Sequence, residues 1–215
     1  MPSVEAVLFD FSGTLARLEE DDSWFTGMGL DAARQVEVMD RMTHPTADVD
    51  HHAWAHRDLD PVRHREAYMH VLRESGLPET HAASLYGKLS DLESWTPYPD
   101  TASVLNALRT IGIRTAVVSN IPWDIRQALS AFGTGADEYV LSFEVGVVKP
   151  DPRIFEIALD LLGVDPGHTL MVGDSPENDG AATVLGCGFA LVDPLPTMDR
   201  PTGLIDALGA AGVVL

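Results

Sequence analysis

The sequence predicts an α/β protein, in which helices cover both faces of a parallel sheet and an all-helical cap is inserted into that core. Strand-like and helix-like segments alternate after about residue 96, the pattern of a parallel sheet flanked by helices. Residues 16 to about 95 instead hold several helix-like stretches, no clear strand and seven of the eight histidines. This shift in composition marks an inserted unit. At 215 residues, 45% of them hydrophobic, the chain can bury a full core and carry the insertion.

The core begins with a short apolar run at residues 4–9, which predicts a buried strand ending at Asp10. The same reasoning predicts later strands at residues 113–119, 138–141, 169–172 and 189–192. Apolar residues at helical spacing predict helices just before 113 and at residues 152–162, 177–185 and 204–208. Asp151 is the expected N-cap of the helix at 152–162, and Pro122 fits the first turn of a further helix.

The insertion leaves the core just after the turn at Asp10 and returns at a proline-rich joint, residues 95–100. We therefore expect a core of residues 1–15 and 96–215 and a cap of residues 16–95. Within the cap, the pattern predicts helices at about 31–43, 50–58, 61–75 and 79–91. An insertion in the loop that follows Asp10 is expected to cover a site at Asp10 as a lid.

Charge and composition exclude several classes of partner. The net charge of −19 argues against nucleic acid and anionic membranes, since both require basic patches on the protein. No apolar stretch approaches the length of a bilayer and no leader-like segment is visible, so we expect a cytoplasmic protein. An anionic substrate would need strong local positive charge, and Lys88 and Lys149 are the only lysines. Cys187, the single cysteine, has apolar neighbours and is expected to be a packed core thiol.

Polar side chains stand at or just after the C-terminal ends of the predicted strands, where open α/β sheets bind ligands. They are Asp10, Ser119 with Asn120, Lys149, and Asp174 with Asp179. Each alone also fits an ordinary turn, cap or surface residue. Together they indicate a carboxylate nucleophile, a phosphate-binding hydroxyl, a positive clamp and an oxygen-ligand site for a hard cation. Gly13 would let the chain fold back closely beside Asp10.

These motifs resemble those of the haloacid dehalogenase superfamily of hydrolases. The matching segments are Asp-x-x-Gly-Thr-Leu at 10–15, Ser119-Asn120, the run from Glu144-Val145-Gly146 to Lys149-Pro150-Asp151-Pro152-Arg153-Ile154-Phe155, and Gly173-Asp174 with Asp179. The resemblance covers nearly the whole chain. It implies a Rossmann-like core with a helical cap inserted after the first motif, in agreement with the insertion at 16–95.

The resemblance also implies a phosphoaspartyl enzyme acting on a small phosphorylated substrate. Asp10 would attack phosphorus while Ser119 and Lys149 hold the transferring group, whose charge a lysine and a metal stabilise in a covered site. The remaining expected substrate contacts are Ser12, Gly13 and Asn120. The oligomeric state stays open.

The implied cofactor is Mg²⁺, which suits carboxylates, a backbone carbonyl and waters. By the resemblance, Mg²⁺ would bridge Asp10, Asp174 and the substrate, and the backbone carbonyl of Ser12 would be a further ligand. Asp179 would act on the metal site through a water or by orienting Lys149.

Ser12 departs from the pattern of most phosphatases of this superfamily, which carry Asp two residues after the nucleophile. That Asp protonates the leaving oxygen and later activates the hydrolytic water. General acid–base catalysis typically contributes about 10²- to 10⁴-fold, so a serine there predicts a weaker phosphatase, a transferase or an enzyme for good leaving groups. We expect rates that fall steeply as the leaving-group pKa rises, and a Ser12→Asp variant that flattens this dependence, unless a cap histidine supplies the acid.

Three other functions stay open. A 2-haloacid dehalogenase is the first, but attack on carbon needs no metal and those enzymes lack the carboxylate of Asp174; Phe155 also stands where they tend to carry tyrosine. A phosphonate hydrolase would need a Schiff-base lysine in the cap, where Lys88 stands alone and late in the segment. The third is a non-catalytic or weakly active phosphate-binding protein, which turnover of acyl or aryl phosphates would distinguish from an enzyme.

Within the cap, His52 and His56 stand four residues apart on an expected helix and could share a zinc ion, but their acidic neighbours favour a solvated face. We expect instead that one cap side chain reaches the leaving group when the cap closes. The side chains considered are His44, His56, Arg41 and Arg57. Trp24 and Phe25, near the first hinge, are expected to pack or to contact substrate.

Overall fold

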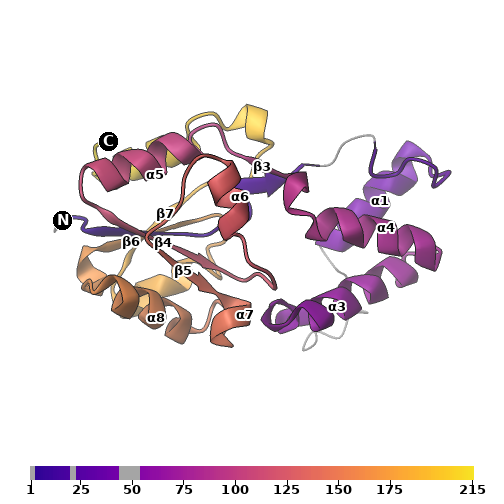
Figure 1. Ribbon diagram of the computed structural model, residues 1–215, viewed down its shortest axis with the longest axis horizontal. Coiled ribbons are helices and arrows are strands. Elements are labelled where there is room, and N and C mark those ends of the chain that lie inside the picture. The colour runs from indigo at the N-terminus through magenta and orange to yellow at the C-terminus, as the bar shows by residue number, and fades with distance from the viewer. Residues whose placement is uncertain (1–2, 20–22, 44–53) are drawn as a thin grey trace.

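A five-stranded parallel sheet forms the centre of the core in the computed structural model, which describes residues 3–19, 23–43 and 54–215. The strand order is β5-β4-β1-β6-β7, with every neighbouring pair parallel. The strands are β1 (Ala6–Phe9), β4 (Arg114–Ser119), β5 (Glu138–Leu141), β6 (Thr169–Gly173) and β7 (Gly188–Leu191). Figure 1 shows α5 on one side of this sheet and α8 on the other, which confirms the predicted α/β class.

Strand β1 lies in the middle of the sheet, and its four residues are fully buried. Because side chains alternate along a strand, Val7 and Phe9 pack into one apolar layer and Ala6 and Leu8 into the other. The first layer is covered by α5 (Thr101–Thr110), α6 (Arg126–Ala131) and α9 (Gly203–Ala210). The second is covered by α8 (Pro152–Leu162) and the 3₁₀ helix η4 (Gly180–Leu185).

The predicted core strands agree with the structure to within one residue at either end from β4 onward. Helix α8 has the predicted bounds, and the Asp151 carboxylate caps it by accepting from the backbone N–H of Arg153 at 3.0 Å. The remaining short elements are α7 (Ser142–Val145), η3 (Pro166–His168) and η5 (Thr197–Asp199).

Two predicted helix starts in the core are wrong. The helix after β4 begins at Arg126 rather than near Pro122, with Ile125 as its N-cap residue, and the Asp124 carboxylate accepts from the Arg126 N–H at 2.9 Å. The helix predicted at 177–185 is instead the shorter 3₁₀ helix η4. Both Asp179 and Gly180 donate their N–H groups to the Ser175 carbonyl, so a tight turn occupies the predicted first helical turn.

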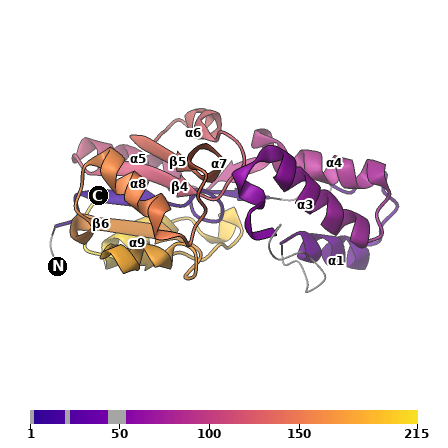
Figure 2. The ribbon, with the colours of Figure 1, turned by 90° about the horizontal axis from the view of Figure 1, so that it is seen from below.

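The inserted segment forms a separate helical layer at one end of the sheet, as Figures 1 and 2 show. Its helices are α1 (Ala32–Thr43), α3 (Pro61–Glu74) and α4 (Glu79–Ser90), with 3₁₀ turns η1 (Arg57–Leu59) and η2 (Leu92–Ser94). They share an apolar core of their own that includes Val38, Leu72 and Leu85. Of the predicted helix at 50–58, residues 50–53 lie outside the described residues, and the rest is a short helical end joined to η1.

The prediction that residues 16–95 contain no strand is wrong at the junction with the core. Strand β2 (Ala16–Leu18) pairs antiparallel with β3 (Trp95–Pro97), so both ends of the insertion leave the core as one ribbon. Three-residue strands are too short for side-chain alternation to reveal them. The division into a core of 1–15 and 96–215 and a cap of 16–95 stays a prediction.

The expected core thiol is confirmed, since Cys187 is buried and free. None of the helices described here combines the length and the apolar character needed to cross a bilayer.

Candidate active site

Asp10 lies at the carboxyl end of the central strand and is 6% exposed. Its backbone N–H donates to the Val172 carbonyl at 3.0 Å, which extends the pairing of β1 with β6 by one residue. The chain then turns sharply through Gly13, whose φ of 78° suits glycine. A Cβ at Gly13 would lie 2.3 Å from an Asp174 carboxylate oxygen, so the turn approaches Asp174 closely only because residue 13 has no side chain.

Lys149 joins the carboxylates of the site. Its Nζ lies 2.6 Å from Oδ1 of Asp10 and 2.6 Å from Oδ1 of Asp179, and the residue is 5% exposed. Ser119 Oγ donates to the same Asp10 oxygen at 3.1 Å. The Asn120 amide holds the backbone of Lys149 from both sides, since Nδ2 donates to its carbonyl at 2.9 Å and Oδ1 accepts from its N–H at 2.7 Å. The loop that carries the lysine is thereby fixed to the end of β4.

Three carboxylates meet at this edge of the sheet. Ligand oxygens of Asp10, Asp174 and Asp179 all lie within 4.8 Å of one another. Asp179 is held there by the Ser175 N–H at 3.0 Å, and it packs so closely on Gly173 that a Cβ there would lie 2.2 Å from a carboxylate oxygen. Clustered oxygen donors of this kind fit a hard divalent cation such as Mg²⁺, Mn²⁺ or Ca²⁺.

The charges of the site favour a bound cation. Burial raises the pKa of Asp10, partly offset by Lys149, and the nearby charge of Asp179 raises it further. Burial likewise raises the pKa of Asp174, and the charges of Asp10 and Asp179 add to this rise. For Lys149, burial lowers the pKa, but contact with Asp10 and Asp179 outweighs burial and raises it above its ordinary value. One ammonium therefore faces three carboxylates, and a divalent cation would neutralise the excess negative charge.

Arg200 holds the turn that follows Asp10. It is 5% exposed, donates from Nη1 to the Gly13 carbonyl at 2.6 Å, and also hydrogen-bonds the Thr14 carbonyl. Its guanidinium lies over the Tyr98 ring, 3.1 Å from the centroid. Sequence reasoning did not identify Arg200, because no local pattern relates it to a turn nearly the whole chain away.

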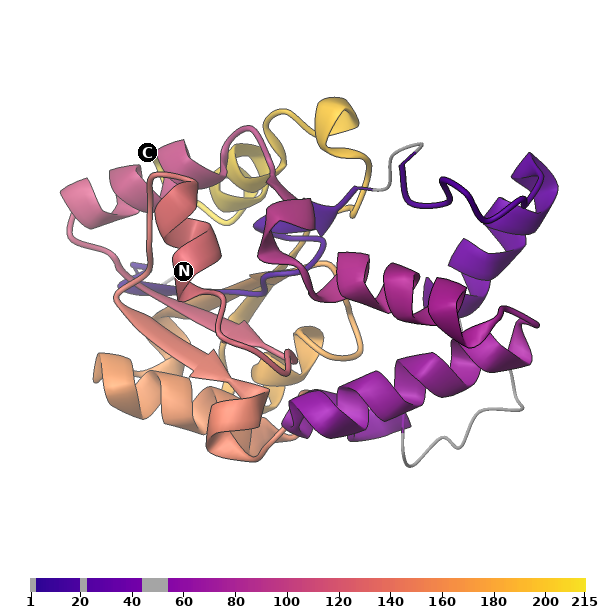
Figure 3. The ribbon, with the colours of Figure 1, turned by 45° about the vertical axis from the view of Figure 1, so that its right-hand side comes forward.

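The cap contributes a second buried polar cluster, centred on Asp58 in η1. The Asp58 side chain is nearly buried, with Oδ2 at 3.3 Å from Arg57 Nη2 and Oδ1 at 3.7 Å from His64 Nε2. The Asp58 backbone carbonyl accepts from Ser142 Oγ at 2.6 Å. Ser142 follows directly after β5, so this contact docks the cap on the core beside the strand ends. Figures 1 and 3 show the start of α3 next to α7 at this point.

Aromatic rings enclose the cluster. His64 Nδ1 lies 3.0 Å from the Tyr86 hydroxyl, and the His64 ring meets Trp123 of the core edge to face at 4.9 Å between centroids. Burial lowers the pKa of His64 to about 3, so the imidazole is neutral. Burial raises the pKa of Asp58 to about 6, although the charges of Arg57 and Lys149 oppose the rise.

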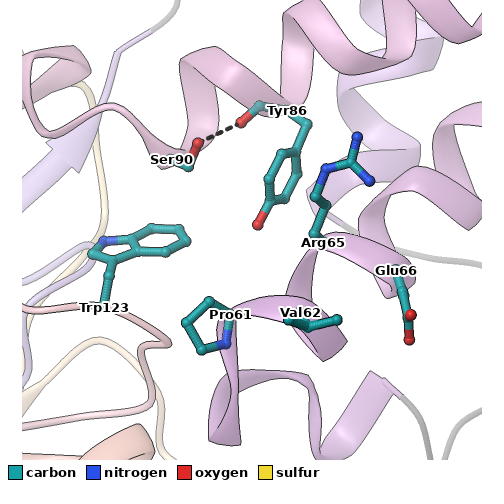
Figure 4. A pocket seen from close by; sticks show the side chains of 7 residues that line it. All are labelled: Pro61, Val62, Arg65, Glu66, Tyr86, Ser90 and Trp123. Carbon is teal, nitrogen blue, oxygen red and sulfur yellow. Dashed lines mark hydrogen bonds between the residues drawn. The ribbon is translucent and has the colours of Figure 1, made fainter.

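A cavity of about 500 Å³ opens beside this cluster, between the cap and the core. Its lining is drawn in Figure 4 and consists of Pro61, Val62, Arg65, Glu66, Tyr86, Ser90 and Trp123. Trp123 comes from the core and the others from α3 and α4, with Ser90 Oγ donating to the Tyr86 carbonyl at 3.0 Å. The cavity therefore depends on the docking of the cap.

Four cap residues considered as substrate contacts in the sequence analysis contact other residues of the cap. Arg57 lies beside Asp58, with its guanidinium 4.3 Å from the Trp54 ring centroid. Arg41 contacts the Glu74 carbonyl at 3.2 Å within the cap. Trp24 and Phe25 are buried in the cap's own apolar core, which supports packing.

The remaining cap residues considered in the sequence analysis either lie outside the described residues or make contacts within the cap. His44, His51 and His52 are outside the described residues, and His56 precedes η1 as its N-cap residue. Lys88 lies 3.5 Å from Ser23 Oγ. Among the residues that the structure describes, the three core aspartates form the one cluster of metal-ligating side chains, so no histidine cluster supports a zinc site there.

The fold and the site define an α/β enzyme with a carboxylate-rich centre beneath an inserted helical cap. Residues 4–186 match the family described as haloacid dehalogenase-like hydrolase. The chain therefore belongs to that hydrolase family, and the resemblance seen in the motifs is confirmed.

Curated relatives include both phosphatases and dehalogenases. Phosphoserine phosphatase of Thermus thermophilus is 32% identical over 132 residues, which are 59% of this chain and 51% of that protein. (S)-2-haloacid dehalogenase 1 of a Pseudomonas species is 32% identical over 125 residues, 56% of this chain and 54% of the relative. The chain thus spans about half the length of the curated relatives it matches. These similarities define a hydrolase family and leave the bond that is cut undefined.

Solved structures agree on the fold. L-2-haloacid dehalogenase from Xanthobacter autotrophicus has a TM-score of 0.69 at 25% identity, covering 94% of this chain and 83% of that one. A phosphatase of this family from Thermococcus onnurineus has a TM-score of 0.57 at 24% identity, covering 88% and 86%.

Proposed function

We propose that the protein is a Mg²⁺-dependent hydrolase of small phosphorylated metabolites that acts through a phosphoaspartyl intermediate on Asp10. The observation that carries this proposal is the meeting of Asp10, Asp174 and Asp179 oxygens within 4.8 Å, with Lys149 bonded to Asp10 at 2.6 Å. A nucleophilic carboxylate needs this combination, because positive charge must gather around the phosphoryl group it attacks.

Lys149 and Ser119 bind the transferring group in this proposal. Both already contact Asp10 Oδ1, so a phosphoryl group seated next to that oxygen would meet an ammonium and a hydroxyl donor. Asn120 would act mainly by fixing the Lys149 backbone, since both ends of its amide are already engaged there. Preorganised donors of this kind stabilise developing charge without rearranging.

Asp10 and Asp174 would hold Mg²⁺ together with the backbone carbonyl of Ser12, and Asp179 would orient Lys149 from the far side. When bound, Mg²⁺ supplies positive charge to the phosphoryl oxygens. Gly13 lets the turn pass against Asp174, and its N–H closes that turn by donating to the Ala16 carbonyl at 2.8 Å. The helical segment at 16–95 would serve as the lid that excludes water from this centre.

Attack on the carbon of a 2-haloacid fits the site less well. That substrate carries its own carboxylate, and it would have to approach a nucleophile flanked by two further carboxylates, Asp174 and Asp179. A divalent cation relieves this repulsion for a phosphorylated substrate, whereas dehalogenation has no use for the metal.

The test is a substrate screen on the purified full chain with Mg²⁺ or with a chelator. The substrates are p-nitrophenyl phosphate, acetyl phosphate, an alkyl phosphate and 2-chloropropionate, with phosphate and chloride as the measured products. We expect phosphate release that requires Mg²⁺. Chloride release that persists in chelator, without phosphate release, would show the proposal to be wrong.

A further inference from the structure

Residue 12 is an exposed serine, so the turn after Asp10 supplies no carboxylic acid to protonate the leaving group. We propose that Asp58 of the cap, docked on the core at the end of β5, is the catalytic acid that protonates the leaving oxygen. This inference rests on the proposed function and adds to it the residue that acts on the far side of phosphorus.

Docking of η1 holds the Asp58 backbone on Ser142, at the end of β5, and through Ser142 on the segment that follows β4. Ser142 Oγ donates to the Asp58 carbonyl at 2.6 Å and also accepts from the Ile121 N–H at 2.9 Å. Ile121 is two residues beyond Ser119, which contacts Asp10. One hydroxyl therefore joins the cap residue to the end of β4, and the position of Asp58 is fixed by the core.

Titratable and charged groups on several elements interact electrostatically with the Asp58 carboxyl. Arg57 lies on the same turn, His64 and Tyr68 on α3, Tyr86 on α4 and Lys149 on the core loop. The charge of Lys149, which contacts Asp10 at 2.6 Å, also lowers the pKa of Asp58, though less than burial raises it.

The surroundings suit a carboxyl that exchanges its proton near neutral pH. His64 is neutral because burial lowers its pKa, so Arg57 is the only cationic partner of Asp58 within the described part of the cap. Burial raises the pKa of Asp58 to about 6. A bound phosphate dianion would raise it further, since a nearby negative charge favours the neutral acid.

In the first step, Asp10 Oδ attacks phosphorus, the bond from phosphorus to the substrate oxygen breaks, and that oxygen takes the proton of Asp58. The products are an alcohol, the phosphoaspartate and the Asp58 carboxylate. In the second step, water attacks phosphorus from the position the alcohol has left, the bond to Asp10 breaks, and Asp58 recovers its proton from that water. Because alcohol and water occupy the same apical position, one carboxyl serves both steps.

Asp58→Asn separates this role from docking. The bond to Ser142 uses the Asp58 backbone carbonyl, which the substitution keeps. Asparagine also keeps the shape of the side chain and loses only the exchangeable proton. Asp60→Asn is unsuitable as a control because Asp60 caps α3, so His70→Gln, at an exposed position of α3, is the matched cap control.

The experiment measures Mg²⁺-dependent hydrolysis of aryl and alkyl phosphates over a range of leaving-group pKa. For Asp58→Asn, we expect the first step, followed as the burst of alcohol released on forming the phosphoaspartate, to be nearly unchanged with p-nitrophenyl phosphate and about 10²- to 10⁴-fold slower with an alkyl phosphate; hydrolysis of the phosphoaspartate should slow equally for both. Adding Ser12→Asp to Asp58→Asn should restore alkyl phosphate hydrolysis at least in part, since it supplies a carboxyl on the core side. His70→Gln should match the unmodified protein.

Two outcomes would overturn the inference. One is an equal loss in the first-step burst rate with aryl and alkyl phosphates in Asp58→Asn, which indicates a structural role. The other is a steep dependence on leaving-group pKa in the unmodified protein, which needs no variant and shows that no acid acts. Failure of the proposed function is distinct from both, because the unmodified protein would then release no phosphate from p-nitrophenyl phosphate with Mg²⁺.

Discussion

The core and cap halves of the site hold buried carboxylates in different ways. In the core, Asp10 and Asp179 share Lys149 at 2.6 Å each, and Asp174 completes a cluster fit for a cation. In the cap, Asp58 has one arginine at 3.3 Å and a neutral histidine. The core carboxylates therefore share an ammonium at a site fit for a cation, whereas the cap carboxyl has a single arginine and a neutral histidine beside it.

The two halves also differ in what they would recognise. The core groups are charged donors that fit any phosphoryl group. The cap presents rings, with His64 against Trp123 at 4.9 Å and Tyr86 on the wall of a cavity of about 500 Å³. In the proposed function, the core would act on phosphorus and the cap on the leaving group. Substitutions in each half test this division of labour.

The largest effect is expected for Asp10→Asn, which removes the proposed nucleophile and keeps its size. By analogy with nucleophile loss in other covalent enzymes, we expect a fall in kcat on the order of 10⁶-fold. Phosphate release under single-turnover conditions is the measurement, and Asp160→Asn on an exposed part of α8 is the control. Activity within about tenfold of the unmodified protein would show that Asp10 is not the nucleophile.

Asp174→Asn should give the next largest effect, by weakening the proposed cation site. Loss of groups that only support a ligand costs about 10- to 100-fold in metal affinity, so a direct ligand should cost at least the upper value. Calorimetric titration with Mg²⁺ alone, without substrate, measures this. If the affinity matched that of Asp160→Asn, the carboxylate cluster would not be the metal site.

Arg200→Met should destabilise the core without touching the cap. It leaves the buried carbonyls of Gly13 and Thr14 without their donor, at a cost of about 3 kcal/mol in the free energy of unfolding. Urea denaturation followed by tryptophan fluorescence gives the value. Arg153→Met, at an arginine whose side chain is 68% exposed, should change it by less than about 0.5 kcal/mol. If Arg200→Met and Arg153→Met changed the free energy of unfolding equally, Arg200 would not stabilise the turn after Asp10.

The smallest effect concerns the cap and is a dependence of stability on pH. The pKa of His64 is lowered from 6.5 to about 3, so below pH 6.5 the unfolded chain takes up a proton that the folded protein refuses. Stability from this group is present above pH 6.5 and is lost as the pH falls, by about 1.4 kcal/mol per pH unit.

Replacing His64 by Gln should remove that loss. Between about pH 6.5 and pH 5, the unmodified protein should lose about 2 kcal/mol relative to His64→Gln, and His70→Gln should follow the unmodified protein. Urea midpoints at several pH values provide the test. If the urea midpoints of all three proteins changed equally with pH, His64 would not be buried in a neutral state.

Much of the core could be predicted from the amino-acid sequence alone. This part comprises the α/β class, the core strands, helix α8 with its Asp151 cap, and the set Asp10, Ser119, Lys149, Asp174 and Asp179. The physical reason is that parallel strands end at one edge of a sheet, so residues that follow strands meet there without knowledge of any further contact. The order of strands along the chain is then sufficient to bring the proposed nucleophile and its partners together.

Tertiary contacts were needed to reveal the β2–β3 ribbon, the clamp of Arg200 on the Gly13 turn and the docking of Asp58 on Ser142. Three-residue strands and a 3₁₀ turn leave no periodic pattern, and contacts between distant segments have no local signal in a single sequence. The pKa of Asp58 likewise depends on burial among groups from several elements, and burial exists only once the cap has packed against the core.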